Sequence, residues 1–147
     1  MTDRKAADLE HSIRERLLNR ARSEGVEFQL VLTKYANERF LYRLGVSPFK
    51  RKFVLKGATL LSLWFQVPGR RTRDVDLLGR GTAEPERVVE TFKTIAVIQA
   101  DDGLRFDAAG VRFEAIREQG DYEGTRVKLD AYLGKARIPL QFDSAFG

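Results

Sequence analysis

The sequence predicts an α/β fold of the α+β kind, in which a helical hairpin precedes a unit of mixed helices and strands. Three observations predict it. Residues 4–44 carry apolar side chains at helical spacing, residues 53–65 follow a strand, turn and helix pattern, and residues 104–142 alternate apolar and polar side chains as strands do. The 147 residues match the usual size of one domain, and neither a repeat nor a linker divides them. We therefore expect a single domain over residues 1–147, with helices over 1–46 and a catalytic core over 47–147.

The N-terminal helices are predicted from two apolar stripes. The first stripe consists of Leu9, Ile13, Leu17 and Ala21, and the second of Phe28, Leu32, Tyr35, Phe40 and Leu44. The four-residue steps of the first stripe predict a helix from about Arg4 to Ser23, which Gly25 ends. A second helix is expected from about Glu27 to Gly45.

The middle of the chain is predicted to fold as a strand, a tight turn and a helix. Residues 53–55 are apolar, residues 57–59 (Gly-Ala-Thr) form the turn, and residues 60–65 form an apolar helix. The alternation of polar and apolar residues over 74–78 then predicts a half-buried strand. Thr82 is expected to cap a helix over about 84–97.

The last third is predicted to be rich in strands. Two short strands are expected around Leu104 to Phe106 and Val111 to Phe113. A hairpin follows, with its turn at Gly134 and Lys135. Its apolar residues are Val127, Leu129, Ala131 and Leu133 on one strand and Ile138, Leu140 and Phe142 on the other. Asp143 is expected on the face opposite Phe142.

The composition excludes several classes of function. Cysteine is absent, which excludes disulfides, thiolate nucleophiles and cysteine-based zinc sites, and the single histidine, His11, lies on the polar side of the first predicted helix. No serine nucleophile elbow, phosphate-binding P-loop or zinc-protease motif occurs. No apolar run is long enough to span a membrane and no signal peptide opens the chain, so we expect a cytoplasmic location. Carboxylate and metal chemistry remains.

The net charge of +5 indicates an anionic partner or simply a soluble surface. Two basic clusters, residues 50–52 and residues 70–73, flank the segment with the strongest candidate site. In that segment Asp74 and Asp76 lie two residues apart on one predicted strand, so their side chains share a face about 7 Å apart. Such a carboxylate pair either lies on a solvated strand edge or binds a cation, and Mg²⁺ prefers these oxygen ligands together with substrate phosphate.

The turn at Gly57, Ala58 and Thr59 opens a predicted helix, whose free N–H groups suit phosphate. The alternative is an ordinary capped helix. Because only one helix and a short loop separate this turn from Asp74 and Asp76, a phosphate cradle is expected beside the metal site.

These segments resemble a known family. Residues 53–61 (FVLKGATLL) and 71–78 (RTRDVDLL) are similar to the K-G-G-T-x-L turn and the D-x-D strand of the AbiEii/AbiGii nucleotidyltransferase toxins. Residues 127–131 and 138–143 are similar to the hairpin that supplies a third carboxylate in that family. The resemblance implies a polymerase-β-type nucleotidyltransferase fold, preceded here by the helical hairpin. It also implies transfer of a nucleotide from a nucleoside triphosphate (NTP) to an acceptor such as tRNA, by the toxin of an abortive-infection toxin-antitoxin pair.

The resemblance also implies roles for individual residues. Asp74, Asp76 and Asp143 would be the catalytic metal ligands, with two Mg²⁺ ions as the expected cofactors. The triphosphate would bind at Lys56, Gly57, Ala58 and Thr59, with Arg71 as a further cation. A winged-helix antitoxin is the expected protein partner, and the acceptor is tRNA, another RNA or a protein.

Two departures from the family pattern matter. Ala58 stands where a second glycine is commoner, and its methyl group limits how closely the backbone approaches phosphate. The chain also ends at Gly147, where family members continue into a helical C-terminal half, so we expect an excised catalytic module or a naturally shortened member. Weak nucleotide binding with little or no transfer is expected of it, and an exposed apolar edge at residues 142–146 that favours self-association or a partner chain. Two alternative hypotheses are a catalytically degenerate binding module of the same fold and a Mg²⁺-dependent nuclease.

Overall fold

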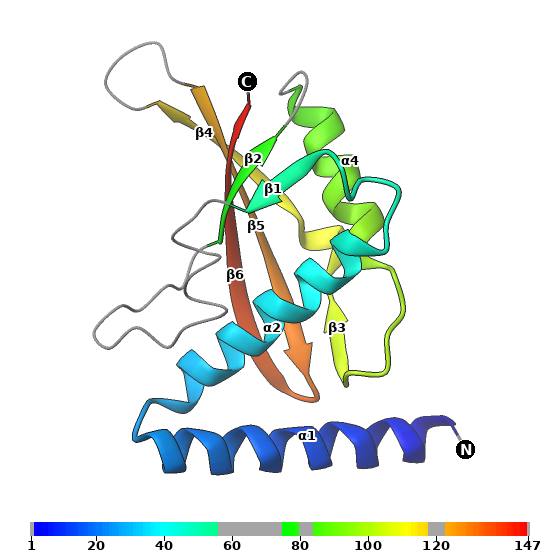
Figure 1. Ribbon diagram of the computed structural model, residues 1–147. Coiled ribbons are helices and arrows are strands. Elements are labelled where there is room, and N and C mark those ends of the chain that lie inside the picture. Colours follow the sequence, from blue (N-terminus) through cyan, green and yellow to red (C-terminus); the bar gives the residue numbers. More distant parts are fainter. Residues whose placement is uncertain (1, 56–74, 80–83, 118–122, 147) are drawn as a thin grey trace.

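The computed structural model describes residues 2–55, 75–79, 84–117 and 123–146, in which a mixed sheet is covered by helices on one face (Figure 1). The chain begins with the predicted helical hairpin of α1 (Thr2–Glu24) and α2 (Phe28–Gly45). Gly25 lies between them with a φ of 67°, a left-handed conformation that glycine adopts without steric cost. Ile13, Leu17 and Ala21 of the predicted stripe are buried, whereas His11 is exposed. The prediction of this hairpin is therefore confirmed.

The sheet contains six strands in the order β1-β2-β6-β5-β3, and β4 also pairs with β5. The strands are β1 (Phe53–Leu55), β2 (Val75–Gly79), β3 (Leu104–Phe106), β4 (Arg112–Arg117), β5 (Glu123–Leu133) and β6 (Ala136–Phe146). The pairing of β2 with β6 is parallel and every other pairing is antiparallel. Helix α4 (Pro85–Ala96) and the short 3₁₀ helix η1 (Ala108–Gly110) complete the described elements. The chain is thus a mixed α/β protein, as predicted.

Helix α4 is present as predicted, but its N-cap residue differs from the prediction. The helix predicted over about 84–97 is present as Pro85–Ala96, but its N-cap residue is Glu84, two positions after the predicted cap Thr82. The reason is that proline suits the first helical position, where its missing N–H is not needed. Thr82 itself lies outside the described residues, as do the predicted turn at 57–59 and the predicted helix at 60–65.

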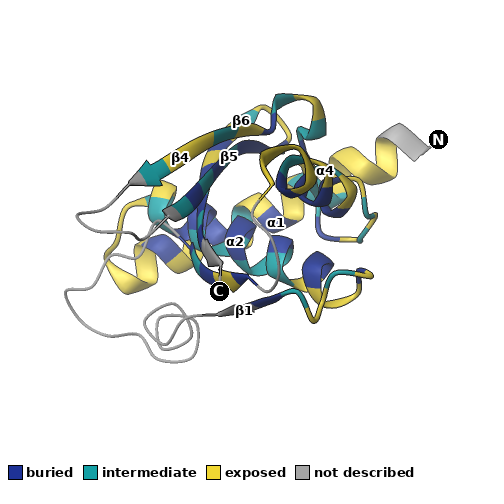
Figure 2. Ribbon diagram, turned by 90° about the horizontal axis from the view of Figure 1, so that it is seen from above, coloured by how far each residue is buried: buried dark blue, intermediate teal, exposed yellow. Residues whose placement is uncertain are grey.

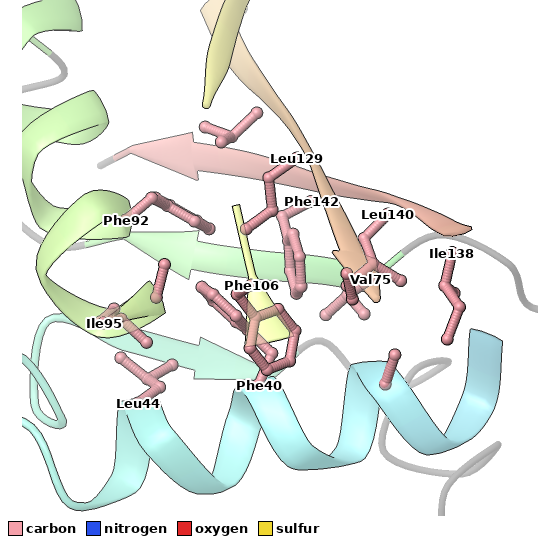
Figure 3. Close-up of a cluster of buried hydrophobic side chains, with 14 of the residues drawn as sticks. Phe40, Leu44, Val75, Phe92, Ile95, Phe106, Leu129, Ile138, Leu140 and Phe142 are labelled. Carbon is pink, nitrogen blue, oxygen red and sulfur yellow. The ribbon is translucent and has the colours of Figure 1, made fainter. Parts of the chain in front are cut away.

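The core lies between the sheet and helices α2 and α4 (Figures 2 and 3). The Phe142 ring of β6 lies 4.6 Å from Phe40 of α2 and 5.5 Å from Phe92 of α4, measured between ring centroids. The two predicted apolar rows of the hairpin all face this core. Val127, Leu129, Ala131, Leu133, Ile138, Leu140 and Phe142 are at most 3% exposed. The hairpin prediction is therefore confirmed.

Over residues 142–145, strand β6 lies between β2 and β5 in the interior of the sheet. Its pairing with β2 extends as far as Phe146 and its pairing with β5 as far as Ala145, and the Phe142 side chain is fully buried. The expectation of an exposed apolar edge over residues 142–146 is therefore wrong for the strand and for Phe142. The error arose because the sequence pattern did not show that β2 pairs alongside β6. Self-association of the chain stays a prediction.

A buried ion pair joins α2 to the loop that precedes β3. The Arg43 guanidinium donates two hydrogen bonds to the Asp102 carboxylate, of 2.6 and 3.0 Å, and both side chains are at most 3% exposed. Arg39 donates a further bond of 2.9 Å to the same carboxylate, and the Leu104 amide another of 3.2 Å. Burial alone would raise the pKa of Asp102, but the hydrogen bonds from Arg43 and Arg39 outweigh it and hold that pKa below its ordinary value.

In the part of the chain that the structure describes, no helix is both long enough and apolar enough to cross a membrane.

Candidate active site

The candidate site lies on the face of the sheet opposite the core. In β2 the buried residues Val75 and Leu77 alternate with Asp76, which is partly exposed. In β6 the buried residues Phe142 and Ser144 flank Asp143, which is also partly exposed. Because side chains alternate between the two faces of a strand, Asp76 and Asp143 both point away from the core.

The strand register brings these two carboxylates together. Asp76 pairs directly with Asp143 across the parallel β2 and β6 strands. Adjacent strands lie about 4.8 Å apart, so the two side chains leave the same face as immediate neighbours. Two carboxylates this close repel each other unless a cation lies between or beside them.

Arg126 of β5 is such a cation. Its Nε donates a 2.9 Å hydrogen bond to Oδ1 of Asp143 and its Nη2 donates a 3.2 Å bond to Oδ2. Gln141, two residues before Asp143 on β6, donates a longer bond of 3.4 Å to the same carboxylate. These contacts fix the orientation of Asp143 beside Asp76. The side chains of Arg126 and Asp143 are 33% and 21% exposed, so the pair remains open to solvent.

The donor set fits Mg²⁺. This ion binds one or two carboxylates and completes its shell with water and substrate phosphates. An ionised carboxylate has about four lone-pair positions, so Asp143 can bind Arg126 and a metal ion together. No group of three potential ligand side chains occurs within the described ranges, so the protein would supply Asp76 and Asp143 there.

Most of the other predicted site residues cannot be placed. Asp74, the remaining predicted metal ligand, lies outside the described residues. The same holds for the predicted triphosphate site, which consists of Lys56, Gly57, Ala58, Thr59 and Arg71. Of the predicted site, the structure thus brings together Asp76 and Asp143 only.

Asp130, a carboxylate on the polar face of β5, lies elsewhere on the sheet. It pairs in register with Pro139, four residues before Asp143 on β6, and accepts a 3.0 Å bond from Arg137. That separation is about 13 Å along the strand. Asp130 therefore does not belong to the carboxylate pair.

Arg126 was not recognised as a site residue from the sequence. The signal was present, because a hairpin with its turn at Gly134 and Lys135 places Arg126 opposite Asp143. A cation opposite a candidate metal ligand is expected to fix that ligand's orientation. The buried pair of Arg43 and Asp102 was missed for another reason, since it joins segments far apart in the sequence.

Comparison with known proteins gave a family match but no individual relative. No curated protein and no solved structure gave a significant match. A family profile described as nucleotidyl transferase AbiEii toxin, type IV toxin-antitoxin system, matches residues 39–147, which include β1 to β6 and both Asp76 and Asp143. The described architecture, an α/β arrangement with a mixed sheet, agrees with a nucleotidyltransferase-type fold. The chain belongs to the AbiEii nucleotidyl transferase toxin family.

Proposed function

We propose that this protein is a Mg²⁺-dependent nucleotidyltransferase that moves a nucleotide from an NTP to an acceptor such as tRNA. One observation carries the proposal beyond the family assignment. Asp76 and Asp143 are direct register partners on the face of the sheet opposite the core, and such a carboxylate pair supports binding of a metal ion together with a substrate phosphate. Asp74 is the third proposed ligand, on the strength of the D-x-D pattern.

The proposed reaction is an in-line displacement at the α-phosphorus. A hydroxyl oxygen of the acceptor forms a bond to that phosphorus, the bond to the bridging oxygen of pyrophosphate breaks, and the hydroxyl proton passes to a carboxylate oxygen of the site. Bound Mg²⁺ would polarise the attacking hydroxyl and neutralise charge on the leaving pyrophosphate. Arg126 contributes by holding Asp143 in place next to Asp76.

The triphosphate is assigned to the turn at residues 56–59, with Arg71 as an additional cation. Two described features support this assignment. Residue 56 follows directly after Leu55, the last residue of β1, and Leu55 pairs with Leu77 next to Asp76. The excess of basic residues in the chain is also suited to phosphate. As the toxin of its pair, the protein is expected to be neutralised by an antitoxin, for which we propose a winged-helix protein.

The test is transfer of label from each α-³²P-labelled NTP to total RNA in the presence of Mg²⁺, followed by electrophoresis. Asp76→Asn and Asp143→Asn are expected to abolish labelling, because each removes a charged metal ligand. Asp8→Asn is the matched control, since it makes the same charge change at an exposed position of α1.

The products distinguish the alternatives. Labelled, lengthened RNA from the wild type and from Asp8→Asn alone supports the proposal. Shortened RNA without incorporated label would identify a nuclease instead. Wild-type protein that binds MgATP but labels neither RNA nor added protein would indicate a binding module of the same fold.

A further inference from the structure

A basic hollow lies near the carboxylate pair, at the edge of the sheet formed by the first half of β6. Strand residues from the face opposite the core and residues of α2, which covers the core face, both line it. It has a volume of about 680 Å³ and lies where the first turns of α2 pass the hairpin of β5 and β6. At this level β6 pairs with β5 only, because β2 begins its pairing at Phe142. Three cations line the hollow, Arg112 of β4, Lys128 of β5 and Arg137 of β6. No carboxylate is among its lining residues within the described part of the chain.

The cations retain capacity for a further anion. Lys128 lies 3.2 Å from Glu114 and is 36% exposed, and Arg137 lies 3.0 Å from Asp130 and is 58% exposed. A lysine has three donors and an arginine five, so one ion pair leaves donors for phosphate. Arg112 is exposed and has no carboxylate within ion-pair distance among the described residues.

The rest of the lining suits a nucleotide base more than a bare phosphate. Gln29 of α2 and Gln141 of β6 supply amide groups, which can hydrogen-bond to base edges. Leu30 and Pro139 supply apolar surface, against which the face of a base can pack. A nucleic acid strand combines these chemistries, since it alternates bases with phosphates.

The hollow adjoins the carboxylate pair through Gln141, which lines it and donates a hydrogen bond to Asp143. Lys128 pairs in register with Gln141. The next pair on the same face of the hairpin, farther from its turn, is Arg126 with Asp143. Gln141 and Asp143 are two positions apart on β6, which is about 7 Å along the strand. A nucleic acid strand that lies in the hollow can therefore present one of its hydroxyl groups to the carboxylates.

We propose that this basic hollow binds the acceptor as a single-stranded RNA segment, with Arg112, Lys128 and Arg137 contacting its phosphates. The identity of the acceptor rests on the proposed function, but the binding site rests on the described residues. In the order of the sheet, β1 and the hollow lie on opposite sides of the carboxylates, because β1 lies beyond β2 whereas the hollow lies over β4, β5 and the first half of β6. Residues 56–59, to which the triphosphate is assigned, follow β1 in the sequence. NTP and acceptor would thus approach the carboxylates from two directions.

The test measures binding of a labelled single-stranded RNA oligonucleotide of mixed sequence by fluorescence anisotropy. The double variant Arg112→Gln with Lys128→Gln is compared with the double variant Arg22→Gln with Lys135→Gln. The control makes the same charge change at exposed positions on α1 and in the β5 to β6 turn, outside the hollow.

We expect the first variant to weaken RNA binding about tenfold and to reduce the slope of log affinity against log salt by about 1.4, since each phosphate contact to a single strand contributes about 0.7. The control is expected to weaken binding less than about threefold, because it changes only long-range attraction. Thermal stabilisation by MgATP is expected to stay equal in all three proteins. Thermal unfolding without ligand shows whether each variant is folded, and Arg112→Gln alone, expected to cost about threefold, replaces the double variant if that one unfolds.

Several results would overturn the inference. These are absence of RNA binding by the wild type, an equal loss in both double variants, or a loss of MgATP stabilisation with unchanged RNA affinity. The last result would assign the hollow to the NTP. Selective loss of RNA binding without any nucleotide transfer by the wild type would support the RNA site and contradict the proposed enzymatic function.

Discussion

Replacing Asp102 by asparagine removes the negative charge from a buried ion pair while keeping the shape of the side chain. Arg43 and Asp102 are 2% and 3% exposed, so water does not screen the guanidinium once its counter-charge is lost. Arg43 keeps its hydrogen bonds to the carbonyl oxygens of Ile98 and Arg39, which satisfy donors but do not neutralise the charge. Removing one partner of a buried pair costs about 3 to 5 kcal/mol.

The assay is urea unfolding followed by far-ultraviolet circular dichroism, with thermal unfolding as a second measure. At about 2 to 4 °C per kcal/mol for a chain of this length, the loss corresponds to a decrease in Tm of about 6 to 20 °C. Arg20→Gln, which breaks the exposed pair with Glu24, is expected to cost less than about 1 kcal/mol. A loss below about 1 kcal/mol for Asp102→Asn would refute the assigned role of the pair. Equal losses for the two variants would do the same.

Four further predictions concern pH, the core, the hairpin turn and the metal site. Because the pKa of Asp102 is lowered on folding, its contribution to stability is present above about pH 4 and is lost as the pH falls through the lowered value, which acid titration of wild type and Asp102→Asn should show. Phe142→Ala is expected to lower the free energy of unfolding by about 3 to 5 kcal/mol in urea, since its ring contacts those of Phe40 and Phe92. Gly134→Ala should cost about 1 to 2 kcal/mol, because the φ of 59° there disfavours residues with a Cβ, and an unchanged urea midpoint would contradict this. Asp76→Asn should keep the wild-type Tm without ligand but lose stabilisation by MgATP, and equal stabilisation of both proteins would argue against the metal site.

The elements that could be predicted from the sequence are those with local signals. The stripe of Ile13, Leu17 and Ala21 predicts α1 because helical spacing alone determines which side chains share a face. The alternation in residues 127–142 predicts the hairpin in the same way, and the glycine at 134 marks its turn. In each case the evidence lies within one element and its neighbour.

What could not be predicted depends on contacts between distant segments. The parallel pairing of β2 with β6 joins Asp76 to Asp143 across 67 residues, and no periodicity in the sequence shows it. The resemblance to the family indicated that these carboxylates act together. The register of the two strands explains how they come to lie side by side. The ion pair of Arg43 with Asp102 is also long-range. The same lack of long-range information led to the mistaken expectation that residues 142–146 form an exposed edge.

The carboxylate pair is positioned by the core more than by its own contacts. The ion pair of Arg126 with Asp143 is partly exposed, so it contributes at most about 1 kcal/mol to stability. Burial of a side chain such as Phe142 contributes several times as much. A slip of one residue in the register of β6 would turn Phe142 toward solvent and Asp143 toward the core. Packing therefore excludes that slip and holds Asp143 beside Asp76, with Arg126 offsetting part of their mutual repulsion, and this enforced proximity is the property that favours a further bound cation.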